Sequence, residues 1–218
     1  MSSNSTGLFE RLRTQVAAAF EKSDIKQKQQ ALGKSWYYDV CALPLRPGKP
    51  LLLGLNWGAD PSARHLPQKS EPGQSSFSTV KSWRFIASSE PFLRRYFHLP
   101  SELNYFNVCP FRSEKVTDLT DRDWRLAIDE FFLNAIDAVN PPSVLMLGAS
   151  NVERLAKYNV VNTHMVSVDD NGRSVNAHVG TLRGRALEAV PFFALPHPGN
   201  HISTQARQRI WAKAFENR

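Results

Sequence analysis

Cysteines and long apolar runs are scarce in this sequence. Its two cysteines, Cys41 and Cys109, lie far apart, which excludes a zinc or iron–sulfur centre held by four thiolates. A disulfide between them is not expected in a reducing compartment. No apolar run reaches the roughly 20 residues that a membrane-spanning helix needs. The N-terminal stretch also lacks the basic region and apolar core of a secretory signal, so we expect a cytoplasmic protein without membrane contact.

Acidic residues are in the minority. The chain of 218 residues has 27 Lys and Arg against 20 Asp and Glu, which gives a formal net charge of +7. A basic surplus favours polyanionic partners such as nucleic acids, although charge alone does not identify one. The length allows a full hydrophobic core, and no linker or internal repeat divides the sequence, so residues 1–218 are predicted to form one domain.

Hydrophobic spacing predicts helices that alternate with buried strands. Helices are expected from the N-terminus to Ser23, over Val80–Phe97 with an interruption at Pro91, and over Asp121–Val139, Asn151–Lys157 and Ser203–Phe215. Strands are expected over Leu51–Leu55, Leu103–Pro110, Ser143–Gly148 and Ala189–Leu195. Residues 159–184 alternate weakly around DDNG, which suggests a hairpin or an excursion from the sheet. This order predicts an α/β fold, a three-layer α/β/α sandwich with a central, mainly parallel sheet.

Polar residues follow the predicted strands at the points where ligands bind in such sheets. Asn56, Trp57 and Gly58 are expected in a loop after the first strand, and the segment that begins at His197 follows the last. Because ligands of open parallel sheets bind beyond the carboxyl ends of the strands, we expect these two segments to face each other across one site.

Several familiar catalytic motifs are absent. The sequence has no G-x-S-x-G, no G-x-x-x-x-G-K-[ST], no G-x-G-x-x-G, and no H-x-E paired with P-C-x-x-C. His197 and His201 have the i,i+4 spacing of metal ligands, but Pro198 and Gly199 between them argue against a helix. We therefore expect no metal site and no cofactor.

The polar groups that remain suit a nucleobase. Asn56 and Asn107 each offer an amide donor and acceptor in one plane, which matches the hydrogen-bonding edge of a base. His197 adds an imidazole, and the aromatic rings of Trp57, Phe77 and Phe111 lie near these residues in the sequence. Since aromatic faces stack on bases, this set of residues predicts a pocket for a flipped base.

Four short segments then resemble motifs of the uracil-DNA glycosylase superfamily, above all its single-strand-selective and mismatch-specific branches. In chain order they read GLNWGAD, SSFS, FNVCPF and HPGNH. The first resembles the family motif G-[MI]-N-P-G, with Trp57 in place of proline. The last resembles H-P-S-P, with Gly199 in place of serine and Asn200 in place of the second proline. These departures concern the shape of the loops and the grip on DNA more than the chemistry.

The resemblance implies a parallel α/β/α sandwich, a monofunctional DNA glycosylase without cofactor, and roles for individual residues. Asn56 would hold the attacking water, and His197 would contact the base oxygen on which negative charge develops. Phe77 would stack on the base, beside Trp57, and Asn107 would read its edge.

Gly58 stands where the uracil-specific branch, with the motif G-Q-D-P-Y-H, has a tyrosine that bars substituents at C5 of the base. The resemblance therefore implies room for 5-substituted pyrimidines. Asp60 lies close to these residues, either as a cap of the loop or as part of the site.

The segment after the last strand is expected to contact DNA. Asn200, His201 and Ile202 would press into the duplex, with Ile202 as the preferred wedge, and Arg207 and Arg209 would neutralise phosphates. An alternative for the two arginines is a solvated helix face.

Three functions remain open at this point. The first is removal of a modified pyrimidine, such as 5-substituted or glucosylated cytosine in phage DNA, and the second is uracil repair. The third is a DNA-binding module of the same fold without catalysis. We expect a monomer that binds DNA, while the preference for single or double strands stays open.

Overall fold

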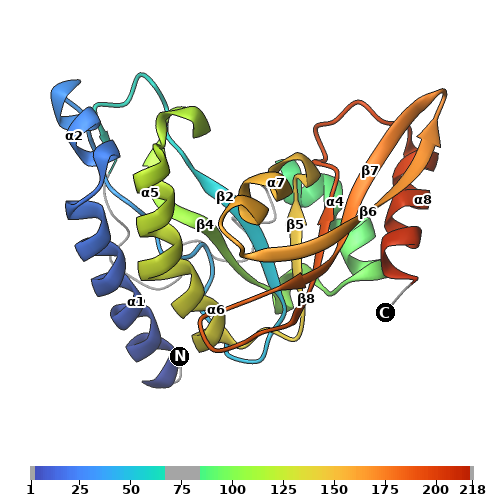
Figure 1. Ribbon diagram of the computed structural model, residues 1–218, viewed down its shortest axis with the longest axis horizontal. Helices are drawn as coiled ribbons and strands as arrows, with labels where there is room; N and C mark the ends of the chain where they lie inside the picture. The colour runs from blue at the N-terminus through green and yellow to red at the C-terminus, as the bar shows by residue number, and fades with distance from the viewer. Residues whose placement is uncertain (1–2, 67–83, 217–218) are drawn as a thin grey trace.

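A computed structural model of the chain describes residues 3–66 and 84–216 (Figure 1). The helices are α1 (Ser3–Glu21), α2 (Asp24–Ala31), α4 (Arg84–Tyr96), α5 (Asp121–Leu126), α6 (Leu133–Val139), α7 (Val152–Lys157) and α8 (Thr204–Phe215). The strands are β1 (Ser35–Trp36), β2 (Leu51–Gly58), β3 (His65–Leu66), β4 (Asn104–Ser113), β5 (Val144–Leu147), β6 (Val161–Asp170), β7 (Arg173–Leu182) and β8 (Val190–Leu195). Short 3₁₀ turns are η1 (Pro100–Glu102), η2 (Val116–Asp118) and η4 (Ala149–Asn151), and η3 (Ala127–Phe132) is a π-helical segment.

The central sheet has six strands in the order β4-β2-β5-β8-β7-β6. The first four strands of this order pair in parallel, while β7 runs antiparallel to β8 and β6 antiparallel to β7. Strands β1 and β3 form a separate two-stranded sheet. The fold class predicted from the sequence, an α/β sandwich with a mainly parallel sheet, is confirmed.

Helices cover both faces of the sheet (Figure 1). Leu51 and Leu53 belong to a first core cluster, together with residues of α1, α5, α6 and α7. Leu52, which points to the other face, belongs to a second cluster with residues of α4 and α8. Because both faces of β2 are buried, the strand reads as a continuous apolar run and not as an alternation.

The N-terminal and central helices follow the sequence prediction closely. In α1, the residues at helical spacing are buried in the first cluster: Leu8, Leu12, Val16, Ala19 and Phe20. The expected helix Asp121–Val139 is one helical run formed by α5, η3 and α6. The side chain of Thr120 accepts a hydrogen bond from the backbone of Asp123, which caps the start of this run.

The expected interruption at Pro91 is wrong. Helix α4 continues through Pro91 from Arg84 to Tyr96, while residues 80–83 of the predicted helix lie outside the described part of the chain. Pro91 is exposed, whereas Ile86 and Leu93 on either side of it are buried in the second core cluster. Packing of this apolar face holds both halves of the helix in line, so tertiary contacts override the local preference of proline.

The first strand is longer than its apolar run. Asn56, Trp57 and Gly58 were expected in a loop, but they belong to β2, because β4 also continues and pairs with them up to Ser113. The pairing shifts between Asn56, which lies opposite Cys109, and Trp57, which lies opposite Arg112. This irregularity is a bulge at the carboxyl end of the strand pair, a position where bulges redirect side chains.

The hairpin predicted around DDNG is confirmed. Strands β6 and β7 pair over their whole length, from Val161 opposite Leu182 to Asp170 opposite Arg173. Asn171 and Gly172 between them have φ angles of 54° and 81°, the left-handed pair that a two-residue hairpin turn requires. Among the described residues, no helix is long and apolar enough to cross a membrane.

Candidate functional site

Strand register brings the two predicted segments to the same edge of the sheet. Leu53 lies opposite Met146 of β5, and Met146 lies opposite Ala194 of β8. Asn56 follows Leu53 by three residues in β2, and His197 follows Ala194 by three residues, in the turn just beyond the end of β8. Since β5 lies between β2 and β8, both residues lie at the carboxyl edge of the parallel strands, on either side of β5.

Hydrogen bonds orient the side-chain amide of Asn56. Its Nδ2 donates to Oγ of Ser113 at 2.9 Å and to the carbonyl oxygen of Trp57 at 3.2 Å. Ser113 is fully buried, so this partner is held in place by the core. No described residue donates to Oδ1 of Asn56, which leaves this oxygen to accept a proton of a water molecule. An amide is too weak a base to deprotonate that water, so it acts by orientation.

His197 lies in an exposed turn whose backbone selects one tautomer. The backbone N–H of Gly199 donates to Nδ1 of His197 at 3.0 Å. Because Nδ1 accepts this bond, the ring proton of the neutral imidazole is on Nε2. Partial burial lowers the pKa of His197, and the positive charge of Arg207 lowers it further. His197 is therefore a neutral donor at neutral pH.

Arg207 holds the turn that carries His197. Its Nη2 donates to the carbonyl oxygens of Pro198 and Asn200, each at 3.2 Å. The backbone of Asn200 also donates to the carbonyl oxygen of His197 at 2.9 Å, which closes the turn. The sequence predicted Arg207 as a phosphate contact; in the structure its guanidinium bonds to the loop and positions it.

The remaining predicted DNA contacts lie on the same loop and on α8. Asn200 and His201 are exposed, while Ile202 is partly buried and packs against the second core cluster. Arg209 is exposed, and its Nη2 donates to the carbonyl oxygen of Asp169 in β6 at 2.5 Å. A carbonyl does not neutralise the guanidinium, and the charge of Arg209 also acts on the carboxylate of Asp170, whose ionised form it helps to stabilise.

Asn107 is buried against Gly54. Its side chain is 2% exposed, and its Oδ1 lies only 1.8 Å from the point where a Cβ on Gly54 would be. The hydroxyl of Tyr105 lies 3.4 Å from that point. Position 54, two residues before Asn56 in the strand, therefore requires glycine, because the side-chain amide of Asn107 occupies the space of a Cβ.

The aromatic residues differ in their exposure. Phe111 is fully buried in the first core cluster, so it does not reach a ligand, and the expectation that its ring lies near a base is wrong. Trp57 is 8% exposed, and its indole N–H donates to the carbonyl oxygen of Asp39 at 2.6 Å. Trp57 thus supports the site from the core and does not offer an open stacking face. Phe77 lies outside the described residues.

Gly58 has open space around it. No described atom lies within 4 Å of a Cβ built on Gly58, and its φ is outside the left-handed region. The carbonyl oxygen of Gly58 accepts a hydrogen bond from Nη1 of Arg112 at 3.2 Å, and Arg112 in turn forms an ion pair with the buried Asp39. Sequence reasoning missed this pair, although Arg112 directly follows the FNVCPF segment.

Asp60 caps its own loop. Its Oδ1 accepts hydrogen bonds from the backbone N–H and the hydroxyl of Ser62, at 2.9 and 2.7 Å. These two bonds lower the pKa of Asp60. A carboxylate with a lowered pKa is a poor general base, which favours the capping role for this residue.

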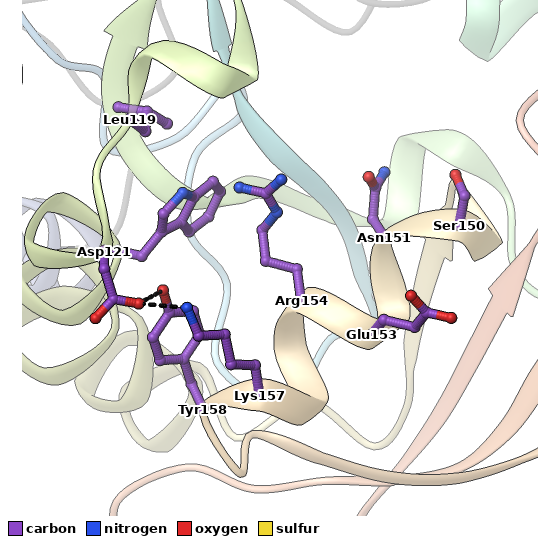
Figure 2. Close-up of a pocket in the computed structure, with 9 residues that line it drawn as sticks. Leu119, Asp121, Ser150, Asn151, Glu153, Arg154, Lys157 and Tyr158 are labelled. Atoms are coloured by element: carbon purple, nitrogen blue, oxygen red, sulfur yellow. Dashed lines mark hydrogen bonds and ion pairs between the residues drawn. The ribbon is translucent and has the colours of Figure 1, made fainter.

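Two cavities open near the carboxyl edge of the sheet. One, of about 430 Å³, is lined by residues of α5 and α7 (Figure 2). The guanidinium of Arg154, which lines it, lies 4.9 Å from the ring centroid of Trp124. In the same view, Asp121 accepts hydrogen bonds from Lys157 and Tyr158. The other cavity, of about 340 Å³, lies beside the loop after β8 and is lined in part by Asn200 and Ile202.

Comparisons with known proteins add no family. No protein-family model matches the chain, and no curated protein matches it significantly. Within residues 3–66 and 84–216, no group of three or more His, Cys, Asp or Glu side chains is arranged to hold a metal ion.

The contact between Gly54 and Asn107 generates a first prediction. Gly54→Ala is expected to lower the free energy of unfolding by roughly 1–3 kcal/mol, because the added methyl group overlaps the buried amide. Asn107→Ala removes the overlapping atom, so the double variant is expected to lose less stability than the sum of the two single variants. Urea unfolding of the wild type and the three variants measures this coupling.

Gly58→Ala serves as the control, because its added methyl group meets no described atom. Additive effects of Gly54→Ala and Asn107→Ala, within about 0.5 kcal/mol, would contradict the close approach.

Proposed function

We propose that the protein is a monofunctional DNA glycosylase that flips a pyrimidine out of DNA and hydrolyses its N-glycosidic bond. The observation that carries the proposal is the pairing, at one edge of the sheet, of a neutral imidazole with an amide oxygen that is free to accept. His197 offers the proton on Nε2, and Asn56 offers Oδ1.

The two groups match the two needs of this hydrolysis. As the bond between the sugar and the base breaks, positive charge develops on the sugar ring and negative charge on the base. The Nε2–H of His197 stabilises the negative charge on a base oxygen, worth roughly 3 kcal/mol for one aligned donor. Water held by Asn56 adds to the anomeric carbon of the sugar and gives up one proton to solvent, while the base leaves with the bonding electrons and takes up a proton from solvent. The products are an abasic site and the free base.

The open space at Gly58 supports a modified pyrimidine as the substrate. Family resemblance sets Gly58 beside C5 of the base, and no described atom would obstruct a side chain there. A substituent of the base would occupy the same space. We propose a 5-substituted cytosine of foreign DNA, including its glucosylated form, as the preferred target, with uracil as the alternative.

DNA is the proposed partner on grounds of charge as well. The net charge of +7 favours association with a polyanion, and Arg209 carries a charge that backbone carbonyls leave in place. A monomer in the cytoplasm remains the proposed state. A binding module without catalysis would share these features, so the assay below is designed to separate it from an enzyme.

Base release is the decisive measurement. Purified protein is incubated with oligonucleotides that contain uracil, hydroxymethylcytosine or glucosylated hydroxymethylcytosine, and the released base is identified by mass spectrometry. His197→Ala and Asn56→Ala are each expected to slow release by about a hundredfold, because they remove the oxyanion donor and the water-orienting oxygen. DNA binding is expected to change little.

His164→Ala and Asn162→Ala are the matched controls, since both residues are exposed on β6 away from the edge. DNA binding without release of any base would identify a binding module, and full activity of either site variant would remove that residue from the mechanism.

The state of His197 generates a prediction on pH. Because the neutral imidazole is the proposed active form, the release rate is expected to be constant near neutrality. It should fall as the pH drops through the pKa of His197, which lies below the ordinary value of 6.5. Arg207→Gln removes a positive charge that lowers this pKa, so the midpoint of the profile is expected to move up. A rate that rises toward acid pH would show instead that the imidazolium is the active form.

The space at Gly58 generates a prediction on substrate choice. Gly58→Tyr is expected to abolish release of the 5-substituted base while sparing any release of uracil, because the ring would fill the space beside C5. Gly58→Ala, which leaves most of the space open, is the control. Continued release of the bulky base by the tyrosine variant would contradict an open pocket at this position.

A further inference from the structure

The cavity of about 340 Å³ beside the last loop is a second binding site that the proposed chemistry does not use. It lies between the turn after β5, the loop after β8 and the β6–β7 hairpin, and its lining includes Ala149, Pro196 and residues of both hairpin strands. Asn200 and Ile202, which also line it, belong to the loop that carries His197. A ligand here would therefore lie next to the proposed active site.

The hairpin presents one face to this cavity. Val166 and Ala177 pair across the two strands and are buried in the second core cluster. The alternate pair, Met165 opposite His178, therefore points to the other face, and both residues line the cavity. Met165 is 58% exposed, which makes it an uncovered apolar surface in a lining that mixes apolar and polar side chains. Thioether sulfur packs favourably against the faces and edges of aromatic rings.

The polar groups of the lining are held in fixed orientations. Oδ1 of Asn176 accepts hydrogen bonds from the hydroxyls of Ser167 and Ser174, at 2.8 and 2.7 Å. These bonds leave Nδ2 as a donor that bonds to no described residue. Across the cavity, Glu153 on α7 offers carboxylate oxygens as acceptors. Burial lowers the pKa of His178, although the negative charge of Glu153 acts to raise it. His178 therefore does not turn this lining into a cationic phosphate site.

An apolar surface flanked by an oriented donor and an acceptor fits a molecule with a flat apolar face and polar edges. We infer that this cavity binds a second nucleobase, from a nucleotide that neighbours the flipped one. The inference rests on the proposed function, because it takes DNA as the ligand. Both strands of DNA contain such bases, and their shared chemistry is a planar ring with hydrogen-bonding edges.

A substituent of the target base itself is not the expected occupant. Such a group would leave the site past Gly58 on β2, whereas the cavity lies at β8 and β7, on the far side of β5. Ile202 lies on the cavity side, where it separates the flipped base from its neighbours in the proposed complex. The neighbouring base, and not the C5 group, is thus the part of the DNA that reaches Met165.

The test measures binding with an uncleavable target, a 2′-fluoro nucleotide, in four oligonucleotide duplexes. One is intact, and the others lack the base on the 5′ side of the target, on the 3′ side, or opposite it. Each missing base leaves a gap in the stack of bases. The wild type is expected to bind one of these three abasic duplexes about tenfold more weakly than the intact one. Met165→Ala and Asn176→Ala are expected to bind the intact duplex about tenfold more weakly and to show no further loss with that gap.

Leu99→Ala, at another exposed apolar position, is the control and should behave as the wild type. The position of the effective gap tells a base of the target strand from a base of the opposite strand. If Met165→Ala and Asn176→Ala respond to all three gaps as the wild type does, the second-base site is refuted while base release still stands. The intact duplex is also prepared with a glucosylated target base. If the variants lose affinity only for that duplex, the cavity binds the sugar and the inference is wrong. If the wild type binds no DNA, the proposed function fails as well.

Discussion

The parallel register of β2, β4, β5 and β8 is the constraint on which the site depends. Residues of these strands are buried on both faces, so a slip by one position would exchange the two core clusters and is strongly disfavoured. The same register brings the carboxyl ends of β2 and β8 to one edge of the sheet, and these ends carry Asn56 and the turn of His197, which come from distant parts of the sequence. The packing that stabilises the sheet therefore also places the two segments, while hydrogen bonds from neighbouring elements orient their side chains.

Much of this framework was predictable, because its signals are local. The spacing of Leu12, Val16 and Phe20 defines α1, and DDNG defines the hairpin turn. The end of β2 was not predictable, because it depends on contacts distant in sequence. Trp57 belongs to the strand because Asp39 accepts its indole N–H and because β4 continues beside it. The continuity of α4 through Pro91 likewise comes from packing that no local pattern encodes.

The same division applies to the site. Asn56 and His197 were found from short motifs, since each follows a buried apolar run. Their orientation was hidden, because it comes from partners without a motif. Ser113 fixes the amide of Asn56 from the end of the neighbouring strand, and Arg207 fixes the turn of His197 from α8. Sequence patterns thus predict the candidate groups, while tertiary hydrogen bonds decide which atom of each group is left to bind another molecule.

The loop after β8 couples its shape to the charge of its histidine. The N–H of Gly199 donates to Nδ1 of His197, and a proton on Nδ1 would set two N–H groups against each other. Protonation would also place a second positive charge near Arg207, whose own hydrogen bonds close the turn. A Cβ at position 199 would lie 3.1 Å from Nδ1, so glycine allows the close contact that the bond needs. Gly199 and Asn200 in this loop are therefore compatible with a neutral imidazole, because protonation of Nδ1 would remove one of the hydrogen bonds that close the turn.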